Sequence, residues 1–250
     1  MTRLLPAFLF CCASTIAQPL TMNDQAFMAQ GSIPPALPNS GNLLFRWVYN
    51  LGVNTNANGY VTNWQDQVVH RNWTNYAAST PLAPTWTPNG VYFAGTNNFL
   101  QASNGPSTID WSNGIVLVAI QGPINRAPAG TFGLLFGAAF GIGFELNYAN
   151  TTWREVNGGG SGTTISSAIT FGTNDIIFNA DNKFYTNGVL SATGGNPGTF
   201  TTQFMGAYSG SSQYYSGYIF EILGYTGVTF TASDIAAVHR YSTNTYGGIP

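Results

Sequence analysis

The alternation of apolar and polar positions, broken by short turn sequences, predicts β-strands along most of the chain. The clearest signal is Lys183–Leu190, in which Asn187 and Gly188 stand between two β-prone runs. Both residues tolerate positive φ, which a two-residue type I′ hairpin requires. We therefore expect a tight antiparallel hairpin, with Asn187 and Gly188 as structural residues.

Further strands are expected on both sides of this hairpin. Ile176–Phe178 leads into a turn at Asn179–Asn182, which makes the region a three-stranded meander. Phe200–Ala207 and Tyr218–Tyr225 predict two more strands, with the loop Tyr208–Gly217 between them. Five strands within about fifty residues, without a helical pattern among them, are typical of an antiparallel sandwich.

Three runs earlier in the chain also predict strands. Leu43–Tyr49 is an apolar run interrupted by Arg46, and Val61–Val69 carries Trp64. We expect Arg46 and Trp64 to be structural residues. Ile115–Gln121 is a continuous apolar run, which is typical of a central strand covered on both faces.

One helix is predicted, at Ala232–Tyr241 near the C-terminus. Thr231 can cap its start and Asp234 lies in the first turn. His239 and Arg240 would then fall in the last turn, where the helix dipole favours positive charge. We expect this helix to pack across one edge of the sandwich.

The composition narrows the classes of partner. Charged residues make up only 6% of the chain, against about 25% in typical soluble domains. Few charges mean little repulsion between neighbouring copies, and the scattered Lys and Arg form no basic patch for nucleic acid. No apolar run approaches the ~20 residues of a membrane-spanning helix. Both cysteines, Cys11 and Cys12, precede the expected sandwich, which therefore contains no disulfide.

The start of the chain allows two interpretations. Met1–Gln18 has one Arg, an apolar stretch and small residues near its end, which is the outline of a secretory signal peptide. The alternative is an apolar, proline-rich arm, residues 1–38, which needs a neighbour to bury its Leu and Phe side chains. We divide the chain into this N-terminal segment, residues 1–41, and a sandwich domain, residues 42–250.

Several segments resemble one known superfamily. They are Leu44-Phe45-Arg46-Trp47, Trp64-Gln65-Asp66-Gln67, Gly90–Leu100, Phe184–Val189, Ser216–Ile222 and a closing helix that ends near Tyr246-Gly247. Together they resemble the laminin-G-like, concanavalin A-like lectin-glucanase superfamily. The resemblance implies an all-β fold, an antiparallel jelly-roll β-sandwich, with one short C-terminal helix; the extended N-terminal arm would precede it. It says little about function, because the superfamily includes lectins, glycosidases, adhesion modules and parts of viral appendages.

The carboxylates do not form the cluster found in glycosidases of that superfamily. Those enzymes carry a Glu-x-Asp-x-x-Glu strand, because retaining hydrolysis needs an acid and a nucleophile about 5 Å apart. Here Glu145, Glu155 and Glu221 are isolated from one another. Glu221 is expected to share a strand face with Ile219 and Leu223 and to be a structural carboxylate held by Arg or N–H groups. We therefore expect no catalytic residues.

Metal and cofactor sites are not marked in the sequence. The superfamily often binds calcium through loop oxygens, and Asp110, Asp175 and Asp181 stand singly among Asn and Gly. Asx-type turns explain these aspartates more simply. We expect no cofactor and no metal, with a loop calcium ion as the alternative.

Aromatic and amide side chains could form a glycan site. Sugar binding needs aromatic faces for C–H surfaces and polar groups for hydroxyls. The candidates are Tyr214, Tyr215 and Tyr218, in or beside a Ser/Gly-rich loop, with Trp153 and Asn147 elsewhere. The alternative is that these are core and rim aromatics.

Three functions are compatible with these features. The favoured hypothesis is a non-catalytic structural or adhesive component of a phage particle, such as a capsid-decorating, fibre or tail-associated protein on the virion surface. It would contact other virion proteins through residues 1–38, could self-associate, and could bind a surface polysaccharide. The second is a secreted cell-surface lectin with a cleaved signal peptide. The third is a polysaccharide hydrolase or lyase with Glu221 as its catalytic residue.

Overall fold

The computed structural model describes fourteen stretches of the chain. They are residues 36–68, 72–74, 83–96, 98–102, 107–110, 115–124, 132–137, 143–147, 152–156, 164–168, 174–194, 199–202, 204–207 and 214–247. Side chains are described for these residues except 72, 107–110, 115, 132–168, 199–202 and 204. All belong to one compact unit, Pro34–Pro250. The expected signal peptide or arm therefore lies almost entirely outside the described residues.

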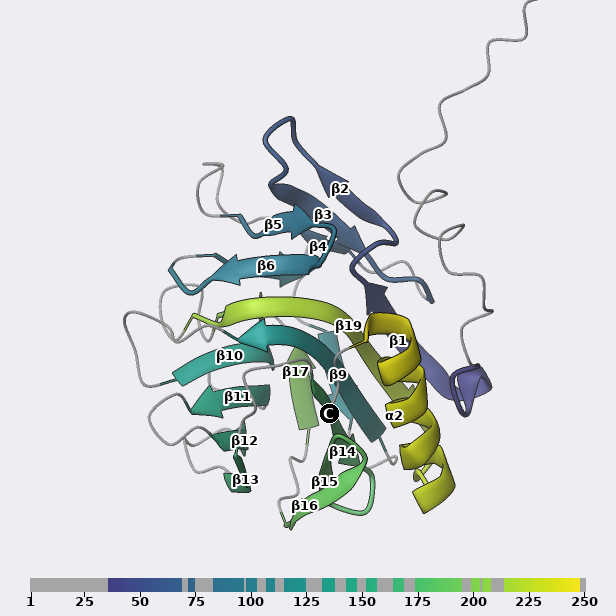
Figure 1. Cartoon of the computed structure of the whole chain (residues 1–250). Coiled ribbons are helices and arrows are strands. Elements are labelled where there is room, and N and C mark those ends of the chain that lie inside the picture. The colour runs from purple at the N-terminus through teal and green to yellow at the C-terminus, as the bar shows by residue number, and fades with distance from the viewer. Residues whose placement is uncertain are drawn as a thin grey trace, which may run out of the picture. The chain divides into compact units, whose positions relative to one another are not determined.

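Two antiparallel sheets dominate this unit, as expected for an all-β sandwich (Figure 1). Sheet A contains, in spatial order, β16 (Val189–Thr193), β15 (Lys183–Thr186), β14 (Asn174–Asn179), β9 (Ile115–Ile124), β19 (Ser216–Thr226), β6 (Gly90–Ala94) and β5 (Thr85–Thr87), and β1 (Leu43–Val48) also pairs with β19. Sheet B contains β13 (Thr164–Ala168), β12 (Thr152–Val156), β11 (Gly143–Asn147), β10 (Phe132–Gly137), β18 (Phe204–Met205), β7 (Leu100–Ala102), β4 (Asn72–Thr74), β3 (Val61–Gln65) and β2 (Val53–Thr55). The pair β17 (Thr199–Thr202) and β8 (Ser107–Asp110), the 3₁₀ turn η1 (Ser40–Asn42) and the helix α2 (Ala232–Tyr246) complete the described elements.

An aromatic core fills the space between the two sheets. Phe45 and Trp47 of β1 enter it from sheet A, and Trp64 of β3 and Trp73 of β4 enter it from sheet B. The rings of Trp47 and Trp73 meet edge to face with centroids 5.5 Å apart, an arrangement that aromatic quadrupoles favour. The indole N–H of Trp64 donates to the Val48 carbonyl oxygen at 2.9 Å, so even its polar atom is satisfied in the core.

A second core covers the other face of sheet A, where α2 packs. Val116, Val118 and Ile120 of β9 contact the same buried cluster as Ile235 and Val238 of α2. The intervening residues of β9 face the core between the sheets. Both faces of β9 are therefore buried, which explains why its sequence is continuously apolar. Below, the face of sheet A that is turned towards α2 is called its outer face.

The helix α2 begins where the sequence predicts and continues five residues further. Thr231 and Asp234 form a reciprocal capping box at its start. The helix ends at Tyr246, before Gly247 with a φ of 65°. Tyr241 is buried and Tyr246 packs against the outer-face core, and this tertiary packing outweighs the weak helix propensity of the intervening Ser, Thr and Asn. His239 therefore lies inside the helix and not in its last turn, contrary to our expectation.

Two of the expected strands have different limits. The expected strand Phe200–Ala207 is two strands, because β17 pairs with β8 whereas β18 joins sheet B. The strand that begins at Val61 ends at Gln65, because the Asp66 carboxylate accepts N–H groups of Arg46 and Val68 outside the ladder. The hairpin between β15 and β16 is present, with φ of 52° and 74° at its two central residues.

Candidate functional site

A β-bulge in β19 determines where Glu221 points. The pairing of β19 with β9 shifts between Ile219 and Glu221, so Phe220 is an extra residue on β19. Ile219 faces the core between the sheets, whereas Phe220 and Leu223 face α2. Glu221 contacts side chains of α2 as well, so it shares a face with Leu223 but not with Ile219. The expected pattern was wrong at this point because a bulge places two successive side chains on one face.

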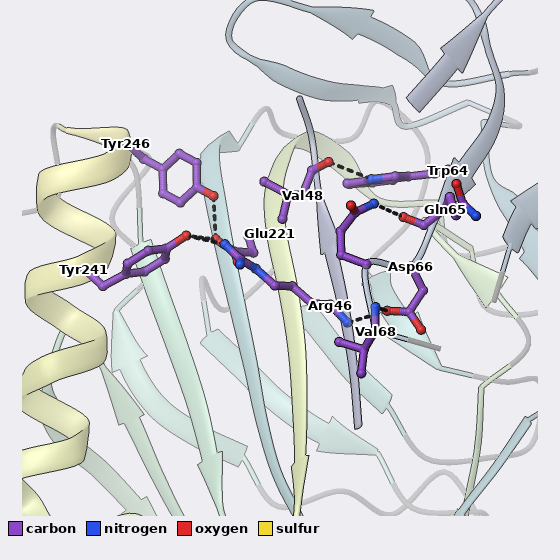
Figure 2. A network of polar contacts seen from close by, with 10 residues as sticks. Arg46, Val48, Trp64, Gln65, Asp66, Val68, Glu221, Tyr241 and Tyr246 are labelled. Carbon is purple, nitrogen blue, oxygen red and sulfur yellow. Dashed lines mark hydrogen bonds and ion pairs between the residues drawn. The ribbon is translucent and has the colours of Figure 1, made fainter. Parts of the chain in front are cut away.

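Glu221 is the centre of a buried polar cluster, shown in Figure 2, which we call the glutamate cluster. Its side chain is 0% exposed. Arg46 Nε donates to Oε1 at 2.6 Å, and the hydroxyls of Tyr241 and Tyr246 donate to Oε2 at 2.8 and 2.5 Å. Arg46 also donates from Nη2 to the Tyr241 hydroxyl oxygen at 2.9 Å. The cluster joins β1, β19 and α2.

The protonation states in the glutamate cluster suit a structural role. Burial raises the pKa of Tyr241 and Tyr246, and the negative charge of Glu221 raises both further. Burial lowers the pKa of Arg46, but the charge and hydrogen bond of Glu221 together with the neighbouring Tyr241 and Tyr246 outweigh this, so the pKa is raised. Both phenols therefore stay protonated and the guanidinium stays charged. A phenol held in this state is a hydrogen-bond donor and not a nucleophile.

The geometry also opposes a catalytic role for Glu221. Both carboxylate oxygens are occupied by donors of the protein itself, and the residue is fully buried. In most glycoside hydrolases a carboxyl group reaches the scissile bond together with a second one nearby. The groups bonded to Glu221 are one guanidinium and two phenols. We therefore interpret Glu221 and Arg46 as residues that fasten α2 to the sheet.

A second polar cluster fastens the middle of α2 to the β15–β16 hairpin. His239 Nδ1 lies 2.7 Å from Oδ2 of Asp175, whose side chain is 0% exposed. Asn187 donates its backbone N–H to the Asp175 carbonyl oxygen and accepts the Asp175 N–H on its side-chain oxygen. A Cβ at Gly188 would lie 3.2 Å from Cβ of His239. The small turn thus lets the helix approach closely.

Two of the three aspartates named for calcium are each paired with a basic side chain through one carboxylate oxygen. Burial raises the pKa of Asp175, although the neighbouring His239 lowers it in part. Asp181 pairs with Lys183 at 2.5 Å on the surface. The side chain of Asp110 lies outside the described part. Among the described residues, no three His, Cys, Asp or Glu side chains are grouped to hold a metal ion.

The residues named for glycan binding do not gather at one place among those the structure describes. Tyr215 is fully buried and its hydroxyl donates to Gln121 Oε1 at 2.9 Å, so this ring has no face for a sugar and the prediction for it was wrong. Tyr214 packs beside a small separate cluster, and Tyr218 lies on the outer face of sheet A. Trp153 and Asn147 belong to β12 and β11, whose side chains are outside the description.

Tyr218 has a partner that we did not identify from the sequence. It pairs directly with Tyr92 across β19 and β6. The two ring centroids are 4.9 Å apart with an angle of 40° between the ring planes. Both side chains are partly exposed on the outer face of sheet A. We call this pair the tyrosine ledge.

Two glycines beside the ledge leave room for aromatic side chains to lie against the sheet. A Cβ at Gly122 of β9 would lie 2.8 Å from both the Tyr218 Cβ and the Phe220 Cζ. A Cβ at Gly90 of β6 would lie 2.9 Å from Phe220. Phe220 therefore lies flat on the sheet, and Tyr246 stacks on it with centroids 4.9 Å apart and ring planes 9° apart. Aromatic rings therefore continue from the ledge along β19 to the C-terminal end of α2.

The strand segments that form and flank the ledge contain no charged residue. They are Thr85–Thr87, Gly90–Ala94, Gln121–Ile124 and Ser216–Phe220. Thr85 pairs with Tyr92, so a threonine stands beside the first ring. These strand segments therefore present aromatic rings and hydroxyl groups to a ligand at the ledge.

Solved structures resemble this fold at low sequence identity. A sialidase from Trypanosoma rangeli, in complex with a difluoro-KDN compound, aligns with 91% of the chain at a TM-score of 0.56 and 15% identity, and its complex with sialic acid aligns with 92% at 0.56 and 14%. The chain spans about two fifths of the sialidase, 39% and 38% of those two structures. Domain 4 of a GH43 extracellular arabinanase from Geobacillus stearothermophilus, in complex with arabinotriose, is less similar, with a TM-score of 0.47 and 15% identity over 79% of this chain and 98% of that domain.

Comparisons of sequence alone give no relatives. No family model matches the chain, and no curated protein sequence matches it. The sialidase that shares the fold is not a phage component, and our expectation of a phage structural component was wrong. That expectation was based on the superfamily resemblance, the missing carboxylate cluster, the low charge and the N-terminal segment, none of which specifies a particle. No described helix is long and apolar enough to cross a membrane.

Proposed function

We propose that this protein is a carbohydrate-binding β-sandwich and that the tyrosine ledge is its binding surface. The observation that carries the proposal is the pairing of Tyr92 and Tyr218, two partly exposed rings side by side on a sheet face. The C–H face of a sugar packs against aromatic rings, while its hydroxyls bond to polar groups at the ring edges. Each tyrosine supplies both kinds of contact.

The shared fold is compatible with a carbohydrate ligand but does not point to a particular sugar. One sialidase structure that shares the fold holds sialic acid, but identity at this level concerns the fold and not the ligand. We also propose that the sandwich belongs to the concanavalin A-like superfamily. Hydrolysis is not part of the proposal, because Glu221 is enclosed within the glutamate cluster.

Binding of the full chain to a panel of polysaccharides tests the proposal. Affinity gel electrophoresis with each polymer in the gel reports retardation, and titration calorimetry then gives the dissociation constant. Tyr92→Ala and Tyr218→Ala should each weaken binding about fivefold or more, because a central aromatic contact is worth more than about 1 kcal/mol.

Two variants serve as comparisons for the ledge. Tyr185 packs on the same outer face from β15, three strands away from β19, so Tyr185→Ala should leave binding unchanged. Tyr214→Ala removes the partly exposed ring that we named from the sequence. If Tyr214→Ala abolishes binding while Tyr92→Ala and Tyr218→Ala do not, the ledge is not the site.

A further inference from the structure

Resting on the proposed function, we infer that the ligand of the tyrosine ledge is a neutral sugar chain and not an acidic glycan. Recognition of a sugar carboxylate relies on Arg or Lys, because charge-assisted hydrogen bonds are about twice as strong as neutral ones. The four strand segments that form and flank the ledge contain no such residue.

Of the described cations, Arg46 and Lys183 are paired within the protein, and Arg240 is exposed on α2. Arg46 Nε is held on Glu221, and Lys183 is paired with Asp181. Lys183 lies on β15, three strand spacings from β19. At about 4.8 Å per spacing this is roughly 14 Å, beyond the Debye length of about 8 Å at physiological ionic strength. Screening therefore removes most of its attraction for an anion at the ledge.

The shape of the ledge favours a chain over a single terminal sugar. Tyr92 and Tyr218 lie on the face of a sheet, on adjacent strands, with their rings inclined by 40°. Thr85 continues this face on one side, and on the other the stacked rings of Phe220 and Tyr246 continue it along β19. Successive sugar units can therefore contact Thr85, Tyr92 and Tyr218 in turn.

The tyrosines also explain how a neutral ligand can bind without charges. A sugar ring buries apolar C–H surface against the aromatic face, and this contribution does not depend on salt. The hydroxyls of Tyr92, Tyr218 and Thr85 donate and accept hydrogen bonds, as sugar hydroxyls do. Affinity then increases with the number of sugar units in contact.

The test measures the full chain against neutral and acidic polymers at two salt concentrations. Laminarin, arabinan and soluble starch are the neutral probes, and polygalacturonate and polysialic acid are the acidic ones, each at 50 and 500 mM NaCl. We expect binding to at least one neutral polymer, with a dissociation constant that changes less than twofold between the two salt concentrations. Its oligosaccharides should bind at least about tenfold more tightly than its monosaccharide.

The outcomes separate this inference from the proposed function. Binding of an acidic polymer that weakens about tenfold or more in high salt, and is lost in Tyr92→Ala and Tyr218→Ala, would overturn the inference while leaving the ledge as the site. Neutral binding in which the monosaccharide equals the oligosaccharides would overturn the inference of a chain ligand. Binding that both tyrosine variants retain would overturn the proposed function, and failure of all five polymers to bind would overturn both.

Discussion

Replacement of Glu221 by Gln tests the interpretation of the glutamate cluster as a buried structural tie. The substitution keeps the volume of the side chain but removes its charge and leaves one oxygen acceptor. Arg46, Tyr241 and Tyr246 all donate to the carboxylate in the native protein. An amide cannot accept all three, because its NH₂ group would face at least one of these donors.

The expected cost follows from burial. Removing one partner of a buried ion pair costs about 3–5 kcal/mol. The Arg46 side chain is 27% exposed, so water screens part of the loss and the lower end, about 3 kcal/mol, is the better estimate. Urea unfolding followed by tryptophan fluorescence at pH 7 measures this free energy, and the midpoint should fall without a change in slope.

An exposed ion pair in the same chain provides the matched control. Lys183 and Asp181 lie 2.5 Å apart, but their side chains are 40% and 33% exposed. Asp181→Asn should therefore cost no more than about 0.5 kcal/mol. The reasoning fails if both substitutions cost the same, or if Glu221→Gln is equally costly when Arg46 has already been replaced by Leu, because the ion pair would then contribute nothing.

Three further predictions concern single positions. Gly122→Ala should weaken sugar binding and lower stability by about 1–3 kcal/mol, since its methyl group would collide with Tyr218 and Phe220; unchanged calorimetric affinity would contradict the geometry of the ledge. Burial raises the pKa of Asp175, so the folded state binds this proton more tightly and loses stability as the pH rises above the ordinary value of 3.8. The stability of Asp175→Asn relative to the native protein should accordingly increase between pH 4 and pH 7 in urea titrations, and a decrease would refute the sign. Thr231→Ala removes the helix cap and should lower the unfolding free energy by about 1 kcal/mol, whereas no change in urea midpoint would show that the cap contributes little.

The sequence predicts best those elements that depend on neighbouring residues. The turn at Asn187 and Gly188 depends on two residues that accept positive φ, and both adopt it. The apolar run of β9 predicts a strand buried on both faces, and it is one. Each of these signals is complete within about ten residues, so no knowledge of distant pairing is needed.

The candidate site depends on contacts between distant segments, which the sequence does not reveal. Tyr92 and Tyr218 become neighbours only because β6 pairs with β19 in one register. Alternation along β6 places the Tyr92 side chain on the other face of the sheet from Val91 and Phe93, which face the core. Alternation does not identify the residue on another strand that pairs with Tyr92. No particular residue type marks the bulge at Phe220 in the sequence. The bulge places Glu221 on the other face of the sheet from Ile219, whereas we expected both on one face.

The most direct test of the account is the affinity of the Tyr92→Ala/Tyr218→Ala double variant for a polysaccharide that the native chain binds. The measurement needs Tyr185→Ala as the control, together with circular dichroism and urea midpoints to show that all three proteins are folded at the assay temperature. We predict that the double variant loses detectable binding while Tyr185→Ala binds as the native chain does. Native affinity in a folded double variant would contradict the assignment of the tyrosine ledge as the carbohydrate-binding surface.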